Sequence, residues 1–226
     1  MNKTEQPDKK NNIAGNKAFR RLVLVLFCFI LLISTCECTS VNNLGIYILD
    51  VIRQKDSYVR EIDDPNWAAK IELTSIPNFH KVSDDLYRGA QPTKDGMKEL
   101  EKFGIKTVVN LRSLHSDKDE LENTQLNYTH IKMTPLDPEM DDIILFLDII
   151  TDSNNTPVFV HCQHGADRTG VMCAIYRVIE QGWTKEYAVE EMTKGGFGFH
   201  SAWNNLADYI RNLDIDKIKQ QRENED

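Results

Sequence analysis

Residues 158–170 read VFVHCQHGADRTG and form the most informative segment of this chain. The first four are mostly apolar, which is typical of a short buried strand, and a helical pattern follows from Thr169 to Gly182. A tight loop between a strand and a helix brings several backbone N–H groups to one point, and the helix adds the positive end of its dipole. In open α/β sheets this edge is where ligands bind. The junction therefore predicts a cradle for a tetrahedral anion.

The flanking sequence predicts an α/β fold with a central, mostly parallel sheet flanked by helices. Short apolar strands alternate with amphipathic helices, which is typical of parallel strands joined through helices. Residues 79–82 and 86–92 are expected to form a hairpin that turns at 83–85. Further strands are predicted within 105–112, 127–133 and 157–161, and helices within 94–103, 141–151, 169–182, 183–196 and 201–213.

Two residues of the loop carry the chemistry. Cys162 lies at its base, where the N–H dipoles stabilise a thiolate and make it a nucleophile at neutral pH. Arg168 closes the loop, and its planar guanidinium can hold two phosphate oxygens at once. Thr169 can donate its hydroxyl to the sulfur when Cys162 becomes the leaving group, and His161 is expected to orient the loop through hydrogen bonds. Gly165 allows backbone angles that a side chain would block.

The cysteines and histidines of this region have other interpretations. A buried cysteine is often only a small apolar side chain, and Cys173 fits that description because it lies in an apolar helix. A zinc site made by His161, Cys162 and His164 would need another spacing, since adjacent His and Cys are unusual zinc ligands. We therefore expect no metal.

The segment HCQHGADRTG (161–170) matches the HCxxGxxRTG signature of the cysteine-based protein tyrosine phosphatases at every fixed position, so the chain resembles that superfamily. LYRGAQP, KTVVNLR, QGWTKEYAVEEM and GGFGFH are similar to segments of its bacterial periplasmic dual-specificity branch, and the resemblance covers residues 66–213. It implies a cysteinyl-phosphate intermediate formed on Cys162, with no metal and no cofactor. The residues that would bind the phosphoryl group are Gln163, His164, Gly165, Ala166, Asp167, Arg168 and Thr169.

The resemblance also implies an aspartate, on a loop upstream of the signature, that protonates the leaving group. We assign this role to Asp137, which stands between two prolines, although the loop lacks the Trp-Pro-Asp string common in the family. Asp141 and Asp142 are alternatives, but they are expected to cap the next helix. Asp167 is a further alternative, and it could instead face outward and tune the charge of the substrate.

The expected function is hydrolysis of phosphomonoesters. Phosphotyrosine is the expected substrate, and phosphoserine and phosphothreonine are candidates for further substrates. The loop contains His164 and Asp167 and no lysine, so it is less basic than a loop built for polyphosphorylated inositols. A lipid or inositol phosphate phosphatase and a non-catalytic module that binds phosphoresidues remain the alternatives. Arg88 and Arg112 flank strands that end near the loop. Contact with substrate and pairing with surface acids are the two alternatives for each, and pairing is expected for Arg88.

Charge limits the partners of the protein. The chain has 226 residues, and 41% hydrophobic with 27% charged residues is an ordinary globular composition. The whole chain has a net charge of −8. Residues 1–21 carry +4, so the rest of the chain carries −12. A protein region with this negative charge is a poor binder of nucleic acid, which is itself negatively charged. The expected partner is a phosphorylated protein.

The N-terminus has the pattern of an export signal. Three basic side chains precede an apolar run at residues 22–33, LVLVLFCFILLI. This run rises about 18 Å as a helix, less than the ~30 Å hydrocarbon core of a membrane. We expect an export signal or membrane anchor at 1–40, a connecting segment at 41–75, the catalytic domain at 76–213 and a charged, frayed tail at 214–226. The catalytic domain is then expected in the periplasm or otherwise outside the cytoplasmic membrane, with a possible tether to that membrane.

Overall fold

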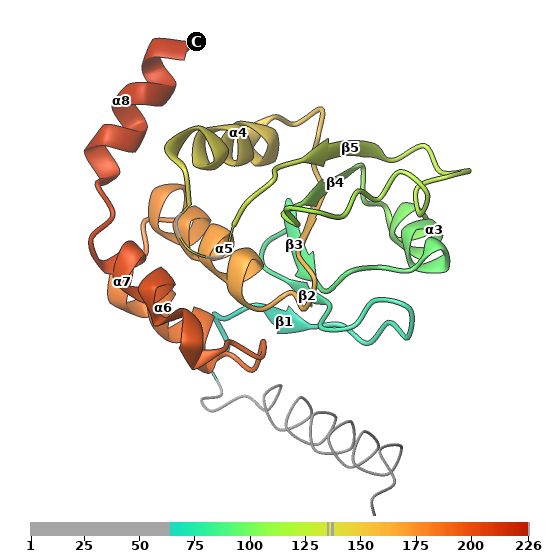
Figure 1. Cartoon of the computed structure of the whole chain (residues 1–226), viewed down its shortest axis with the longest axis horizontal. Coiled ribbons are helices and arrows are strands. Elements are labelled where there is room, and N and C mark those ends of the chain that lie inside the picture. Colours follow the sequence, from blue (N-terminus) through green and yellow to red (C-terminus); the bar gives the residue numbers. More distant parts are fainter. Residues whose placement is uncertain (1–63, 135, 137, 226) are drawn as a thin grey trace, which may run out of the picture. The chain divides into compact units, whose positions relative to one another are not determined.

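The computed structural model describes residues 64–134, 136 and 138–225, and Figure 1 shows the arrangement of their helices and strands. The strands are β1 (Ala69–Lys70), β2 (His80–Lys81), β3 (Leu86–Gly89), β4 (Thr107–Asn110), β5 (Asn127–His130) and β6 (Val158–His161). The helices are α3 (Lys94–Phe103), α4 (Met140–Thr151), α5 (Asp167–Ile179), α6 (Lys185–Lys194), the 3-10 turn η1 (Ser201–Trp203), α7 (Asn204–Arg211) and α8 (Ile215–Glu225).

The strands form one mixed sheet in the order β1-β2-β3-β6-β4-β5. β1, β2 and β3 pair antiparallel, whereas β3, β6, β4 and β5 pair parallel. This confirms the predicted α/β fold and the predicted hairpin. The sheet begins at Ala69, within the segment 41–75 that we expected to be a connection. β6 lies between β3 and β4, with His161 in register with Gly89 on one side and Asn110 on the other.

Side chains of the central strands alternate between two hydrophobic clusters, one on each face of the sheet. Val158 and Val160 of β6 pack with residues of α4 to α8, whereas Phe159 packs with residues of α3. This is the period of two that a strand imposes on its side chains. Figure 1 shows α3 and α5 on opposite sides of the sheet. Because both faces are covered, all four residues of β6 are buried, which holds the strand before the predicted loop in place.

A buried ion pair connects α5 and α6 to the beginning of the sheet. Arg177 donates two hydrogen bonds to Glu191, from Nε to Oε2 at 2.8 Å and from Nη2 to Oε1 at 2.6 Å. Glu191 also accepts a hydrogen bond from the backbone N–H of Ala68 at 2.6 Å, and Arg177 donates to the carbonyl of Val82 at 3.1 Å. Both charges are therefore paired and hydrogen-bonded, as buried charges need to be.

The C-terminal segment differs from its prediction. The expectation that residues 214–226 fray is wrong for Ile215–Glu225, which form α8. Ile218 is fully buried in the larger cluster, and Arg222 donates to Asp148 of α4 at 2.8 Å. Tertiary packing stabilises a helix whose own composition is mostly charged.

No helix in the described ranges combines the length and the apolar character needed to cross a membrane. The apolar run at residues 22–33 lies outside those ranges.

Candidate active site

The predicted loop lies at the carboxyl end of the central strand. Cys162 follows β6 directly and is only 3% exposed, and α5 begins at Asp167. Because β6 is flanked by β3 and β4 in parallel, the carboxyl ends of three strands meet around the cysteine. Arg168 lies in the first turn of α5. The loop therefore begins at the sulfur and ends at the guanidinium, and the helix N-terminus adds its positive end at the same point.

Hydrogen bonds from outside the loop hold each of its carbonyl groups. In a trans peptide the N–H of the next residue points away from the carbonyl, so these outer bonds turn the N–H groups of residues 163–167 toward the inside of the loop. In the described part of the chain, the N–H groups of Gln163, Gly165 and Ala166 donate to no protein acceptor, which leaves them for an oxyanion. The outer bonds are His161 Nδ1 to Cys162 O (3.1 Å), Gln91 N to Gln163 O (3.2 Å), Asn78 Nδ2 to His164 O (2.9 Å), and Arg88 Nη2 to Gly165 O (2.7 Å) and Ala166 O (3.4 Å).

Gly165 is the residue of the loop that must be glycine. Its φ is +69°, a conformation that residues with a side chain rarely adopt. A Cβ at this position would lie 2.4 Å from the carbonyl carbon and oxygen of Gly89 and 2.7 Å from the N atom of Ala90. The loop therefore lies directly against the end of β3, and the missing side chain makes this approach possible.

Arg88 has a different role from the expected one. It is 1% exposed and, contrary to our prediction, pairs with no surface acid in the described part of the chain. Its guanidinium carbon lies 3.8 Å from the centre of the Phe197 ring, and Nη2 donates to Gly165 and Ala166. Arg88 thus fixes the loop from behind. The sequence shows an arginine in a strand, but it does not show that the strand is buried on both faces.

Arg168 is positioned by two carbonyl groups. Its Nη1 lies 3.4 Å from the carbonyl oxygen of Leu111, which follows β4, and 3.5 Å from that of Met133, which precedes the predicted acid loop. Arg112 lies on the same edge and donates to the side chain of Gln91 at 3.1 Å. The two arginines give the mouth of the loop a positive potential within an acidic chain.

Asp167 is held within the protein and does not face outward. It is 7% exposed, and its two oxygens accept hydrogen bonds from the backbone N–H and from Nδ1 of His200, both at 2.9 Å. The His200 ring lies 5.6 Å from the ring of His164, measured between centroids. Burial, followed by the positive charge of His200, lowers the pKa of His164. Asp167 therefore ties the start of α5 to the segment before α7.

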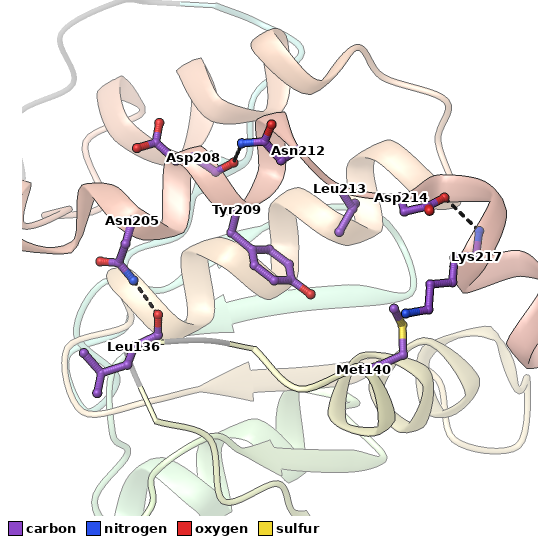
Figure 2. Close-up of a pocket in the computed structure, with 9 residues that line it drawn as sticks. All are labelled: Leu136, Met140, Asn205, Asp208, Tyr209, Asn212, Leu213, Asp214 and Lys217. Carbon is purple, nitrogen blue, oxygen red and sulfur yellow. Dashed lines mark hydrogen bonds between the residues drawn. The ribbon is translucent and has the colours of Figure 1, made fainter.

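The predicted general acid, Asp137, lies outside the described residues. Its neighbour Leu136 is exposed, and the carbonyl oxygen of Leu136 accepts a hydrogen bond from Asn205 Nδ2 at 2.5 Å, as Figure 2 shows. Asp141 and Asp142 do not cap α4 as expected. They lie in its first turn, after the N-cap position, where their carboxylates face the positive end of the helix. Burial, with the negative charges of Glu139 and Asp141, raises the pKa of Asp142.

A cavity of about 540 Å³ borders the segment that contains Leu136. Figure 2 shows it between this segment, the start of α4 and the helices α7 and α8. Leu136 is close in sequence to Met133, whose carbonyl contacts Arg168. The lining combines apolar and polar side chains, namely Leu136, Met140, Asn205, Asp208, Tyr209, Asn212, Leu213, Asp214 and Lys217.

Sequence reasoning missed Asp117, which lies between the predicted strands within 105–112 and 127–133. The residue is fully buried, and its Oδ2 lies 2.7 Å from Nε2 of His161. Its Oδ1 accepts a hydrogen bond from Gln91 Nε2 at 2.9 Å. His115, Asp117 and Glu120 also bring three ligand-type atoms within 4.8 Å of one another. The bond to His161 already occupies Asp117, so we assign no metal to this group.

Two further predictions concern Thr169 and Cys173. Thr169 Oγ1 is buried and has no hydrogen-bond partner in the structure, so the expected bond to the sulfur of Cys162 is not formed here. Cys173 is 1% exposed within the larger cluster, which confirms that it packs in the core. Burial raises the pKa of the Cys173 thiol to about 11, which keeps it protonated and unreactive at neutral pH.

A cysteine at the base of an N–H cradle, closed by an arginine at the carboxyl edge of an α/β sheet, defines the class of cysteine-based phosphatases. The chain matches the family model described as "DSP-PTPase phosphatase fused to NAD+ Kinase" over residues 60–206. The dual specificity protein phosphatase TpbA of Pseudomonas aeruginosa (strain UCBPP-PA14) is 32% identical over 158 residues, which are 69% of this chain and 70% of TpbA. The chain therefore belongs to the dual-specificity branch of the cysteine-based protein tyrosine phosphatases, and it is a phosphatase.

Two other relatives bear on the substrate. The crystal structure of a Cys-to-Ser variant of P. aeruginosa TpbA in complex with phosphotyrosine has a TM-score of 0.64 at 28% identity and covers 72% of this chain and 99% of that structure. Inositol diphosphatase DSP5 of Arabidopsis thaliana is 30% identical over 162 residues, which are 66% of this chain and 75% of that protein.

Proposed function

We propose that this phosphatase hydrolyses phosphotyrosine in proteins through a cysteinyl-phosphate intermediate. The observation that carries the proposal is the loop itself, in which every carbonyl from Cys162 to Ala166 is held outward and the N–H groups turn inward. Such a ring stabilises both a thiolate and the equatorial oxygens of a phosphoryl group under attack. Arg168 supplies the compensating charge beside it.

The reaction has two steps. The Cys162 thiolate attacks phosphorus, the bond from phosphorus to the tyrosine oxygen breaks, and Asp137 gives its proton to that oxygen. Asp137, now a carboxylate, takes a proton from water as the water oxygen attacks the cysteinyl phosphate. The S–P bond breaks, and inorganic phosphate and the thiolate are released. Asp167 cannot easily replace Asp137 as the acid, because both of its oxygens are bound to His200.

Two observations favour a phosphoprotein over an inositol phosphate. The loop holds one acidic side chain, Asp167, and no lysine. TpbA, which shares the fold and 32% of the aligned residues, is a dual specificity protein phosphatase.

The test is phosphate release by the full-length chain in detergent, with a chelator present. We expect hydrolysis of p-nitrophenyl phosphate and of a phosphotyrosine peptide, inhibition by vanadate, and no turnover by Cys162→Ser. A Cys162→Ser protein that hydrolyses as fast as the parent would overturn the mechanism. Turnover of soluble inositol phosphates in preference to the peptide would move the assignment to the alternative substrate class.

We also propose that the catalytic domain works outside the cytoplasmic membrane. Support comes from the basic flank and the apolar run at residues 22–33. Protease added to intact cells with a permeabilised outer envelope should degrade the domain. Protection in that assay, with degradation only after lysis, would place the domain in the cytoplasm.

A further inference from the structure

A buried pair of ionisable side chains lies directly behind the nucleophile and is not used by the mechanism above. Asp117 and His161 are both fully buried, and Asp117 Oδ2 lies 2.7 Å from His161 Nε2. His161 is the last residue of β6 and immediately precedes Cys162. Its other ring nitrogen, Nδ1, lies 3.1 Å from the carbonyl oxygen of Cys162.

The two contacts determine how many protons the ring carries. A carboxylate oxygen and a carbonyl oxygen are both acceptors, so each ring nitrogen must donate to make its bond. A neutral imidazole has only one N–H group and would leave one of these short contacts without a proton. Both bonds are made only when His161 is an imidazolium.

Asp117 provides the compensating negative charge. Burial opposes its ionisation, but hydrogen bonds from His161 and Gln91 and the nearby charge of His115 outweigh burial and hold the pKa of Asp117 below its usual value. A buried charge of either sign is stable only when it is paired and hydrogen-bonded. Asp117 and His161 satisfy this condition for each other.

We propose that Asp117 is a positioning residue of the active site, which holds His161 as a permanent imidazolium and through it stabilises the thiolate of Cys162. The proposal rests on the proposed function, in which Cys162 is the nucleophile. The imidazolium acts in two ways. Its Nδ1–H group fixes the Cys162 carbonyl, and so the first inward N–H group of the loop. Its positive charge is carried by the residue next to Cys162 in the chain, whereas Asp117 binds the ring nitrogen opposite the one that faces the Cys162 carbonyl.

Other charged groups face this region, and Asp117→Asn leaves them in place. His115 Nε2 lies 3.5 Å from Asp117 Oδ1, and its side chain is partly exposed. Arg112 reaches Asp117 only through Gln91. Arg88 binds the carbonyl groups on the other side of the loop, and Arg168 binds those of Leu111 and Met133. Of these groups, His115 is the one that contacts Asp117 directly, so His115→Gln is measured in parallel.

The first experiment measures the pH midpoint at which iodoacetamide alkylates Cys162 in the full-length chain. Trypsin cuts after Lys132 and Arg168, so mass spectrometry finds Cys162 and Cys173 in different peptides and the N-terminal cysteines in others. Asp117→Asn keeps the size of the side chain, and its amide can donate to a neutral ring. We expect this variant to raise the midpoint by about one pH unit, because the positive charge beside the sulfur is lost. In the pH profile of kcat/KM for p-nitrophenyl phosphate, the midpoint of the acid limb should move to higher pH by the same amount.

The matched control is Asp119→Asn, which removes the same charge from an exposed residue of the same segment and should leave the midpoint unchanged. Because Asp117 acts through His161, Asp117→Asn should have no further effect in a His161→Gln background. An unchanged midpoint in Asp117→Asn, or equal shifts in both backgrounds, would overturn the proposal.

A second measurement needs no variant. Two-bond 1H–15N spectra of the wild-type chain distinguish an imidazolium from either neutral tautomer. We expect the spectra at about pH 8 to show a proton on both ring nitrogens of His161, because both nitrogens face acceptor oxygens. A neutral ring at that pH would refute the proposal even if the variants fail to fold. Wild-type protein with an imidazolium but no hydrolysis would instead remove the proposed function and leave only the ion pair of Asp117 and His161.

Discussion

Replacing Gly165 with alanine tests how closely the loop is fitted to the sheet. The residue has φ +69°, and a Cβ in this left-handed region costs about 1–2 kcal/mol. The added Cβ would also lie 2.4 Å from backbone atoms of Gly89, which cannot rotate away as a side chain could. Overpacking of this kind costs typically about 1–3 kcal/mol, so we expect the free energy of unfolding to fall by roughly 2–5 kcal/mol. Because the loop must also move off β3, kcat/KM should fall by about 100-fold or more.

Gly182→Ala is the matched control. Gly182 has φ +67°, and no atom lies within 4 Å of the position of an added Cβ. This variant should therefore lose only the free energy of unfolding that a side chain costs in the left-handed conformation, about 1–2 kcal/mol. Its kcat/KM should be unchanged. Urea unfolding followed by circular dichroism gives the stability of both variants, and p-nitrophenyl phosphate gives their activity. Equal loss of stability in both variants, with full activity in Gly165→Ala, would refute the close fit of the loop against β3.

Three further changes test the supports of the fold and the buried thiol. Arg177→Ala leaves the carboxylate of Glu191 buried without its partner, so urea unfolding should show a loss of about 3–5 kcal/mol, and a loss below 1 kcal/mol would contradict the buried pair. Ile218→Ala removes the buried contact of α8 and should cost about 2–5 kcal/mol, whereas a frayed tail would tolerate it. The pKa of Cys173 is about 11 in the folded chain and its usual value is 9.0. Between these values the unfolded chain binds fewer protons than the folded one, so stability falls as pH rises, by about 2–3 kcal/mol at pH 11. Cys173→Ala should lack this part of the decline, and an equally steep decline in the variant would show that other groups cause it.

Much of the fold could be predicted because its signals are local. The helix α3 begins after Thr93, whose side chain accepts from the N–H of Gly96 at 3.1 Å, and it ends before Gly104, as the sequence predicts. The strand β6 and the helix α5 were also predicted, because an apolar run and a helical period meet within a few residues. The positions of Cys162 and Arg168 followed from the same segment, since both lie within one loop whose ends these two elements define.

The errors have a common cause, which is burial that arises between segments distant in sequence. Arg88 was expected at the surface because arginine usually is, but it lies behind the loop against Phe197. The helix α8 was expected to fray because its composition is charged, yet packing of Ile218 holds it in place. The sequence did not single out Asp117, because it stands among polar and charged residues whose side chains are exposed.

The sequence alone predicted a phosphatase of the cysteine-based class, with Cys162 as nucleophile, an anion-binding loop and Arg168 as clamp, because these groups are neighbours along one short stretch of chain. Only the tertiary structure decided what holds that stretch in its working shape. The donors to the loop carbonyls come from Asn78, Arg88, Gln91 and His161, and Asp117 stands behind the last of them. Most of these residues are far from the loop in sequence, and only the register of the parallel strands brings their short-range hydrogen bonds within reach.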